Sequence, residues 1–97
     1  DFSKNAIDVY NFIRGMSPSP CAYTFIGDKR LKVYFAVMTD ITSDKPSGTV
    51  VNEKDLTVVC GDKKCIRFTD VQGEGGKRMN TASFLNGNKL QRDTVLN

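Results

Sequence analysis

The sequence has 97 residues, 39% of them apolar, and 14 Lys and Arg against 11 Asp and Glu, which gives a net charge of +3. This length predicts one domain, residues 1–97, and the composition is typical of a folded chain rather than a disordered one. No apolar run approaches the roughly 18 residues that a membrane span needs. The polar start DFSKN carries no secretory signal and no initiator Met, so we expect a fragment or a processed product.

Cysteine and histidine usage argues against several classes of site. The three cysteines, Cys21, Cys60 and Cys65, are an odd number, which argues against a disulfide framework. A structural zinc needs four ligands, and the chain contains no His, so we expect no metal site. Without His there is also no Ser–His or Cys–His nucleophile. The acidic residues are scattered at turns, so we expect no catalytic residue in this chain.

The first predicted element is a helix over residues 4–14, with Ser3 as its N-cap. Its apolar stripe is expected to consist of Ile7, Tyr10, Phe12 and Ile13. Gly15 and the SPSP stretch should end the helix, because Pro18 and Pro20 cannot continue it. Residues 1–21 are therefore expected to be a helix followed by a Pro-rich segment.

Residues 22–72 have the short alternating runs of a small barrel. We predict strands at 22–26, 30–38, 48–52, 56–60 and 65–71, with Gly27 and Asp28 in the first hairpin turn and Ile66 and Phe68 on one face of the last strand. In the second strand, alternation predicts Leu31, Val33, Phe35 and Val37 on one face. It predicts Arg30, Lys32, Tyr34 and Ala36 on the other. Cys60 and Cys65 should flank a turn as partly buried residues.

The stretch GEGGKRMNTASFL, residues 73–85, raises the question of phosphate binding. A P-loop, G-x-x-x-x-G-K-S/T, would need Gly and Ser or Thr where Val71 and Arg78 stand. The dinucleotide pattern G-x-G-x-x-G also places Arg78 where its third Gly belongs. We therefore predict a sharp loop, in which Lys77 and Arg78 either face a partner's phosphates or are only turn charges.

The remaining residues predict a short helix and an irregular tail. Asn80 or Thr81 can cap one or two helical turns that run through Leu85 and stop at Gly87. Residues 73–97 thus comprise the Gly-rich basic loop, this helix and the tail. The chain as a whole is predicted to be mainly β, with one helix before the strands and a short one after them.

A basic strand is the strongest functional signal in the residues themselves. Arg30, Lys32 and Tyr34 recur at every second position, beside Lys29. Basic side chains next to an aromatic ring on a small barrel are suited to a nucleic-acid backbone. A solvated strand face is the alternative. Lys63 and Lys64, at a hairpin tip, are expected to be ordinary turn charges.

The order of motifs resembles the C-terminal domain of the methionyl-tRNA formyltransferase family along nearly the whole chain. VYNFIRGMSPSPCAYTFIGDKRLKVY, residues 9–34, is similar to the family's IRG…P-W-P-G-A-Y-T…K-R-L-K stretch. GTVV, LTVVCGD and IRFTDVQGEGGKRMNTASFLNG follow in the family's order. The resemblance implies a five- to six-stranded OB-like barrel with an N-terminal helix and a short C-terminal helix.

The resemblance also implies a parent enzyme in the cytoplasm. That parent transfers a formyl group from 10-formyltetrahydrofolate to methionyl initiator tRNA for translation initiation. Its catalytic Asn, His and Asp and its folate site lie in an N-terminal Rossmann-type domain, so none of them transfers to this chain and no cofactor is expected here. The implied partners of this chain are the phosphate backbone of initiator tRNA and the catalytic domain.

The basic strand and the family motifs together give seven candidate tRNA-binding residues: Arg14, Lys29, Arg30, Lys32, Tyr34, Lys77 and Arg78. Arg14 falls in the family's IRG, although it can also pair with the carbonyl end of its own helix. Phe84 and Leu85 match the family's F-L. Two positions depart from the pattern: Ser19 replaces the usual Trp, and Cys21 replaces the usual Gly, which suggests that no positive φ is needed there.

Two alternatives to the tRNA-binding module stay open. Similar domains occur in other 10-formyltetrahydrofolate-dependent formyltransferases and dehydrogenases, where the domain would serve as a structural module without an RNA partner. A stand-alone oligonucleotide-binding protein is the second. The basic GKRM and DKRLK stretches favour the tRNA module.

Overall fold

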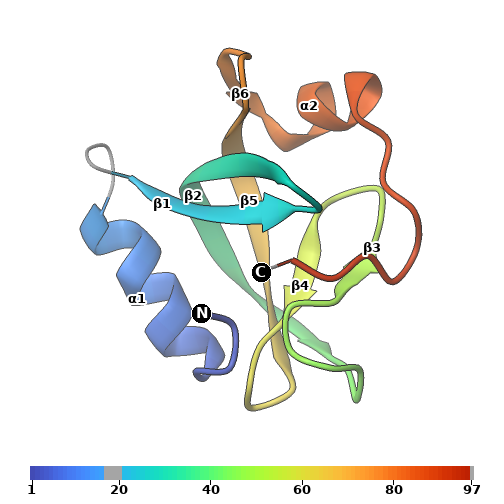
Figure 1. Ribbon diagram of the computed structural model, residues 1–97. Helices are drawn as coiled ribbons and strands as arrows, with labels where there is room; N and C mark the ends of the chain where they lie inside the picture. The colour runs from blue at the N-terminus through green and yellow to red at the C-terminus, as the bar shows by residue number, and fades with distance from the viewer. Residues whose placement is uncertain (17–20, 97) are drawn as a thin grey trace.

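An antiparallel sheet of six strands organises the described residues, 1–16 and 21–96, in a computed structural model of the chain (Figure 1). The strands are β1 (Ala22–Ile26), β2 (Lys29–Thr42), β3 (Val50–Asn52), β4 (Thr57–Val59), β5 (Lys64–Gly73) and β6 (Arg78–Asn80). Their order is β1-β2-β5-β4-β3, and β6 pairs with β5. The prediction of a mainly β fold flanked by two helices is confirmed, but strand pairing alone does not close the sheet. β6 was not predicted, because its residues lie in the expected Gly-rich loop.

The first helix, α1 (Ala6–Met16), packs against β1, β2 and β5 (Figure 1). It begins two residues later than predicted, and Ser3 is not its N-cap, because the Ser3 hydroxyl donates to Oδ1 of Asp1 at 2.7 Å instead. The free amide of Ala6 donates to Oδ1 of Asp62, 3.1 Å away in the β4–β5 turn. The helix also continues through Gly15, against the prediction that Gly15 ends it. Pro18, Ser19 and Pro20 lie outside the described residues.

The buried face of α1 differs from the predicted stripe. Ala6, Val9 and Ile13 are buried in the core, and Tyr10 packs at its edge. Ile7 and Phe12 are exposed, so their place in the stripe was wrong. Spacings of three and four residues from Ala6 to Val9 and Ile13 define the helical face, and the predicted stripe missed both Ala6 and Val9.

Strand β2 carries a bulge that reverses its alternation halfway along. Leu31 and Val33 are buried as predicted. The register with β5 then shifts on both sides of Phe35. Phe35 is 51% exposed and Val37 is also exposed, whereas Ala36 is buried, so the predicted faces are wrong from residue 35 onward. An extra residue in one strand turns the following side chains over, and no single-strand pattern reveals it.

The core lies inside the curved sheet and centres on Phe68, Leu31, Leu56 and Ile66, all almost fully buried. The predicted shared face of Ile66 and Phe68 is confirmed. The ring of Phe2 lies 6.1 Å from that of Phe68, which joins the N-terminal segment to the core. Cys60 and Cys65 are fully buried rather than partly buried.

Cys21 occupies a backbone conformation that glycine favours. Its φ is +76°, so the expectation that this position needs no positive φ was wrong. Its buried thiol donates to the carbonyl of Val33 at 3.4 Å. The side chain therefore gains a partner at a position where glycine would relax the backbone.

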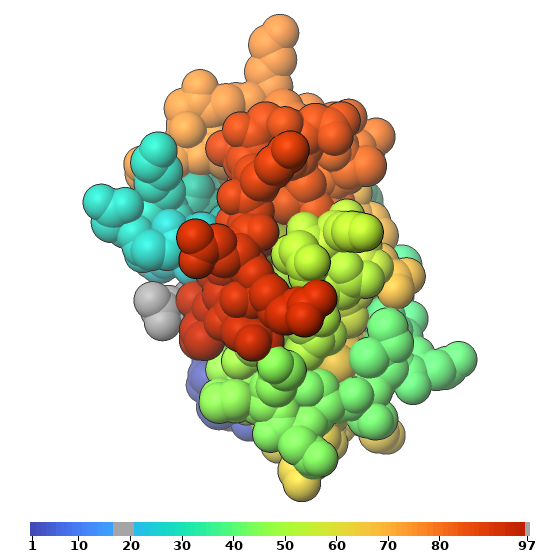
Figure 2. All heavy atoms as spheres, turned by 90° about the vertical axis from the view of Figure 1, so that its right-hand side faces the viewer, coloured from blue at the N-terminus to red at the C-terminus, as the bar shows by residue number. Residues whose placement is uncertain are grey.

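The C-terminal tail spans the opening that the strands leave. Leu96 forms an antiparallel bridge with Ile26 at the end of β1, and Val95 forms one with Thr49 beside β3. The Leu96 amide donates to the carbonyl of Gly48 at 2.8 Å. Figure 2 shows this deep-red tail between the cyan β1–β2 hairpin and the green segment around β3. The tail, predicted as irregular, thus links the two edges of the sheet.

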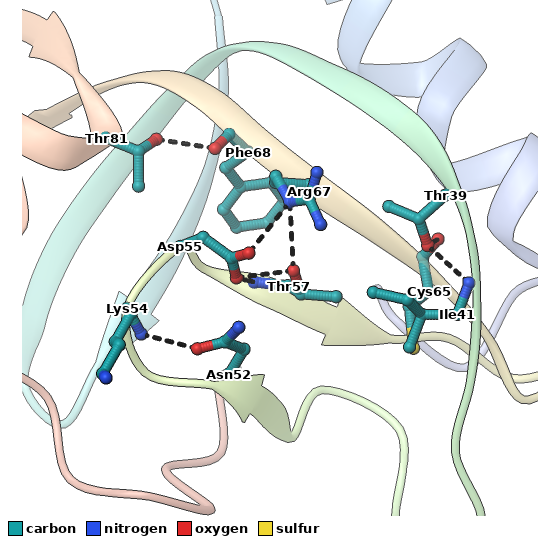
Figure 3. Close-up of polar contacts among 10 residues, drawn as sticks. All are labelled: Thr39, Ile41, Asn52, Lys54, Asp55, Thr57, Cys65, Arg67, Phe68 and Thr81. Atoms are coloured by element: carbon teal, nitrogen blue, oxygen red, sulfur yellow. Dashed lines mark hydrogen bonds and ion pairs between the residues drawn. The ribbon is translucent and has the colours of Figure 1, made fainter.

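The second helix, α2 (Thr81–Gly87), is capped as predicted. Asn80 is its N-cap and accepts a hydrogen bond from the Ser83 amide at 2.8 Å. The Thr81 hydroxyl donates to the carbonyl of Phe68 at 2.6 Å, which ties the helix to β5 (Figure 3). The helix ends two residues beyond the predicted Leu85.

Because its cysteine thiols are buried, the protein is expected to lose stability as the pH becomes alkaline. Burial, with the nearby Asp62 carboxylate, raises the pKa of Cys60 to about 12. The pKa of an unfolded cysteine thiol is near 9.0, so the contribution is complete below about pH 9 and is lost as the pH rises toward 12. We expect urea unfolding to show a steeper fall over this interval for the native chain than for Cys60→Ala. Equal slopes would contradict this assignment.

Candidate nucleic-acid interface

The outer faces of β1, β2, β5 and β6 form a continuous surface, which we call the outer face. Strand register puts Tyr23 opposite Lys32, Lys32 opposite Gln72, and Gln72 opposite Arg78. These four side chains point away from the core, because their neighbours Ala22, Leu31, Val33 and Val71 are buried. Local alternation and pairing therefore align an aromatic ring, an ammonium, an amide and a guanidinium across four strands.

A second row beside it adds aromatic surface. Phe25 pairs with Arg30 across β1 and β2. The rings of Tyr23 and Phe25 meet edge to face with centroids 5.7 Å apart, and the Arg30 guanidinium lies 5.8 Å from the Tyr23 centroid. Tyr23 is 59% exposed, so much of its ring is accessible to a partner. Aromatic rings beside cations suit the bases and phosphates of a nucleic acid.

Hydrogen bonds hold the centre of the outer face in place. The Tyr34 hydroxyl donates to Oε1 of Gln72 at 2.7 Å, and Nε2 of Gln72 donates to the carbonyl of Gly76 at 2.9 Å. This chain of contacts fixes the β5–β6 turn to β2. Gly75 has a φ of +76°, which supplies the sharp reversal predicted for the glycine loop.

Arg78 is the most constrained cation on the surface. Its guanidinium lies 4.4 Å from the Tyr34 centroid and 5.4 Å from that of Phe35. Its Nη2 forms an ion pair with Oδ2 of Asp70 at 2.6 Å. Among the described residues, no hydrogen bond or ion pair engages its Nη1. Arg78 is therefore pre-oriented, although Asp70 neutralises part of its charge.

The seven predicted residues separate into three places. Arg30, Lys32, Tyr34 and Arg78 come together on the outer face. Lys29 and Lys77 lie at a neighbouring cleft. Arg14 lies on α1, where its guanidinium is 5.5 Å from the Tyr10 ring, four residues back on the same helix. That contact is local, and it connects Arg14 to none of the other six.

Sequence reasoning missed Tyr23, Phe25 and Gln72. The alternation in AYTFI contains the signal for the first two, because Ala22 and Thr24 are the small residues that face inward. No sequence signal singles out Gln72, since its role comes from pairing with both β2 and β6.

Several other cations are engaged elsewhere. Arg67 contacts Asp55 at 3.2 Å and Thr57 at 3.3 Å and stabilises the turn before β4 (Figure 3). Lys63 forms an ion pair with Asp44, and Lys45 forms one with Asp93.

Within residues 1–16 and 21–96, no group of three or more potential ligands could hold a metal ion. Neither helix in this part of the chain is long and apolar enough to cross a membrane.

Comparison with known proteins identifies the family. The family described as "Formyl transferase, C-terminal domain" matches residues 1–89. Methionyl-tRNA formyltransferases of Clostridium novyi (strain NT) and Bacillus thuringiensis (strain Al Hakam) are each 35% identical over 98 residues, and that of Bacillus mycoides (strain KBAB4) is 36% identical. Each comparison covers 99% of this chain but 31% of the relative. The chain therefore belongs to the family of formyl transferase C-terminal domains.

Proposed function

We propose that this chain is the noncatalytic, tRNA-binding C-terminal domain of a cytoplasmic methionyl-tRNA formyltransferase. The whole enzyme would formylate methionyl initiator tRNA with 10-formyltetrahydrofolate and so serve translation initiation. The observation that carries the proposal is the row of Tyr23, Lys32, Gln72 and Arg78 on the exposed sheet. Cations held beside aromatic rings favour contact with a phosphate backbone.

The proposed contribution of this domain is to position the tRNA. Phosphate contacts fix orientation and carry little sequence information. Lys32 supplies a point charge, and Arg78 offers a planar donor that Tyr34 and Asp70 already orient. Selection of the initiator tRNA and the formyl transfer itself would belong to the N-terminal catalytic domain, which would also bind the folate.

A salt titration of initiator tRNA binding tests the proposal. We expect Lys32→Ala/Arg78→Ala to reduce the slope of log K against log[salt] by roughly one to two units relative to the native chain. Lys4→Ala/Lys64→Ala is the matched control, because it removes two charges from exposed side chains away from the outer face. Thermal unfolding of each variant checks that the fold is intact. Equal slopes for all three proteins would contradict the proposal.

The alternative is a structural module that packs against its own catalytic domain without RNA. Two observations favour it: Asp70 neutralises part of Arg78, and α1 exposes Ile7 and Phe12. The same titration decides between the two functions. If neither the native chain nor the variants bind tRNA at low salt, the packing module becomes the better assignment.

A further inference from the structure

A cleft of about 390 Å³ opens beside the outer face. The β1–β2 turn, the β5–β6 turn and the end of α2 form its walls. These segments, cyan, orange and deep orange in Figure 2, converge in one corner of the molecule. The volume lies within the range of small-ligand sites, roughly 300–1,000 Å³, and suits a single nucleotide.

The rim of the cleft is strongly basic. Lys29, Lys77 and Lys89 come from its three walls, and among the residues that the structure describes Glu74 is the one acidic residue that lines it. Within residues 1–16 and 21–96, none of the three lysines is in an ion pair or a side-chain hydrogen bond. Three ammonium groups without an ion pair outnumber the single carboxylate around this concavity and favour an anion, and a phosphate suits such point charges.

The lining between these charges is apolar. Leu31, Met79 and Phe84 contribute to it. Gly73 makes this packing possible, because a β-carbon there would lie 2.9 Å from a ring atom of Phe84. The cleft therefore combines an anion-attracting rim with a surface that would bury the flat, weakly polar face of a base.

The cleft is continuous with the outer face. Arg30 lines the cleft and also lies over the ring of Tyr23. Gly76 lines it too, and its carbonyl accepts the hydrogen bond from Gln72 on the outer face. A nucleic-acid strand that follows the outer face would thus reach the cleft without leaving the basic surface.

We propose that this cleft binds one unpaired nucleotide of an RNA, with its phosphate at the lysines and its base against Met79 and Phe84. The inference rests on the proposed function, since it assigns the cleft to the RNA whose backbone the outer face contacts. A paired base cannot enter, because its faces are stacked in the duplex. The cleft would therefore distinguish RNA with a free end or loop from an uninterrupted duplex.

Two RNA hairpins of the same stem test the proposal, one blunt and one with a single-stranded 3′ extension. We expect fluorescence anisotropy to give roughly tenfold tighter binding of the extended hairpin by the 97-residue chain. Lys89→Ala should abolish this preference and leave the blunt hairpin unaffected, because Lys89 lies on the cleft and not on the outer face. The matched control is Lys64→Ala, at the far β4–β5 hairpin, which should retain the preference.

A 2-aminopurine in the extension provides a second readout. Its emission should shift to shorter wavelength on binding the native chain, as the base leaves water. Equal affinity for the two hairpins, or a preference that Lys89→Ala does not change, would overturn the cleft assignment and leave backbone binding by the outer face intact. Failure of both hairpins to bind at low salt would overturn the proposed function together with it.

Discussion

Replacing Leu96 with alanine is expected to lower the free energy of unfolding by about 2–5 kcal/mol. Leu96 is only 2% exposed and belongs to the main core. It bridges to Ile26, and its amide donates to Gly48. Truncation of the Leu96 side chain would leave a cavity between the two edges of the sheet, where the strands do not pair with one another. Urea unfolding followed by circular dichroism measures the effect.

Val95 provides the matched control within the same tail. Its side chain is 49% exposed, so Val95→Ala should change stability by less than about 0.5 kcal/mol. If the two variants lose equal stability, the tail does not seal the sheet as described. The comparison separates burial of one side chain from the backbone contacts of the tail, which both variants retain.

The tail also supports the candidate site. Ile26 ends β1, whose strand carries Tyr23 and Phe25, and it lines the cleft as well. A loosened tail would free this edge of the hairpin. The order of the outer face therefore depends on the C-terminal tail, although the tail contributes no polar side chain to that face.

Much of the fold follows from the sequence because its signals are local. The Gly27–Asp28 turn, the alternation of AYTFI and the Asn80 cap each depend on a few neighbouring residues. The errors arise where residues distant in the sequence determine the local structure. The start of α1 is set by Asp62, and the faces of β2 are set by a bulge against β5.

The candidate site also contains residues that local sequence predicts and residues that only strand pairing brings into place. Arg30, Lys32 and Tyr34 follow from alternation in one strand. Strand β6 has only three residues, and its pairing with β5 is what brings Arg78 over the Tyr34 ring. The engagement of Arg78 by Asp70 likewise needs the register of β5 and β6, which no pattern within one strand contains.

The C-G-D motif at residues 60–62 holds the N-terminal segment against the β4–β5 turn. Cys60 is buried, the Gly61 amide donates to the carbonyl of Lys4 at 2.8 Å, and Asp62 accepts from Ala6. A β-carbon on Gly61 would lie 1.9 Å from the carbonyl oxygen of Ser3. Backbone atoms cannot rotate away as a side chain can, so the whole N-terminal segment would have to move.

Gly61→Ala is therefore expected to destabilise the protein by more than about 3 kcal/mol. Displacing residues 3–6 would also remove the bond from Ala6 to Asp62 and disturb the contact between Phe2 and Phe68. Gly87→Ala is the control, because a β-carbon at Gly87 would meet no atom within 4 Å and Gly87 is the last residue of α2, where alanine is favoured by at most about 1 kcal/mol. Urea unfolding should move in opposite directions for the two variants. A native-like stability for Gly61→Ala would show that the N-terminal segment does not pack against the β4–β5 turn.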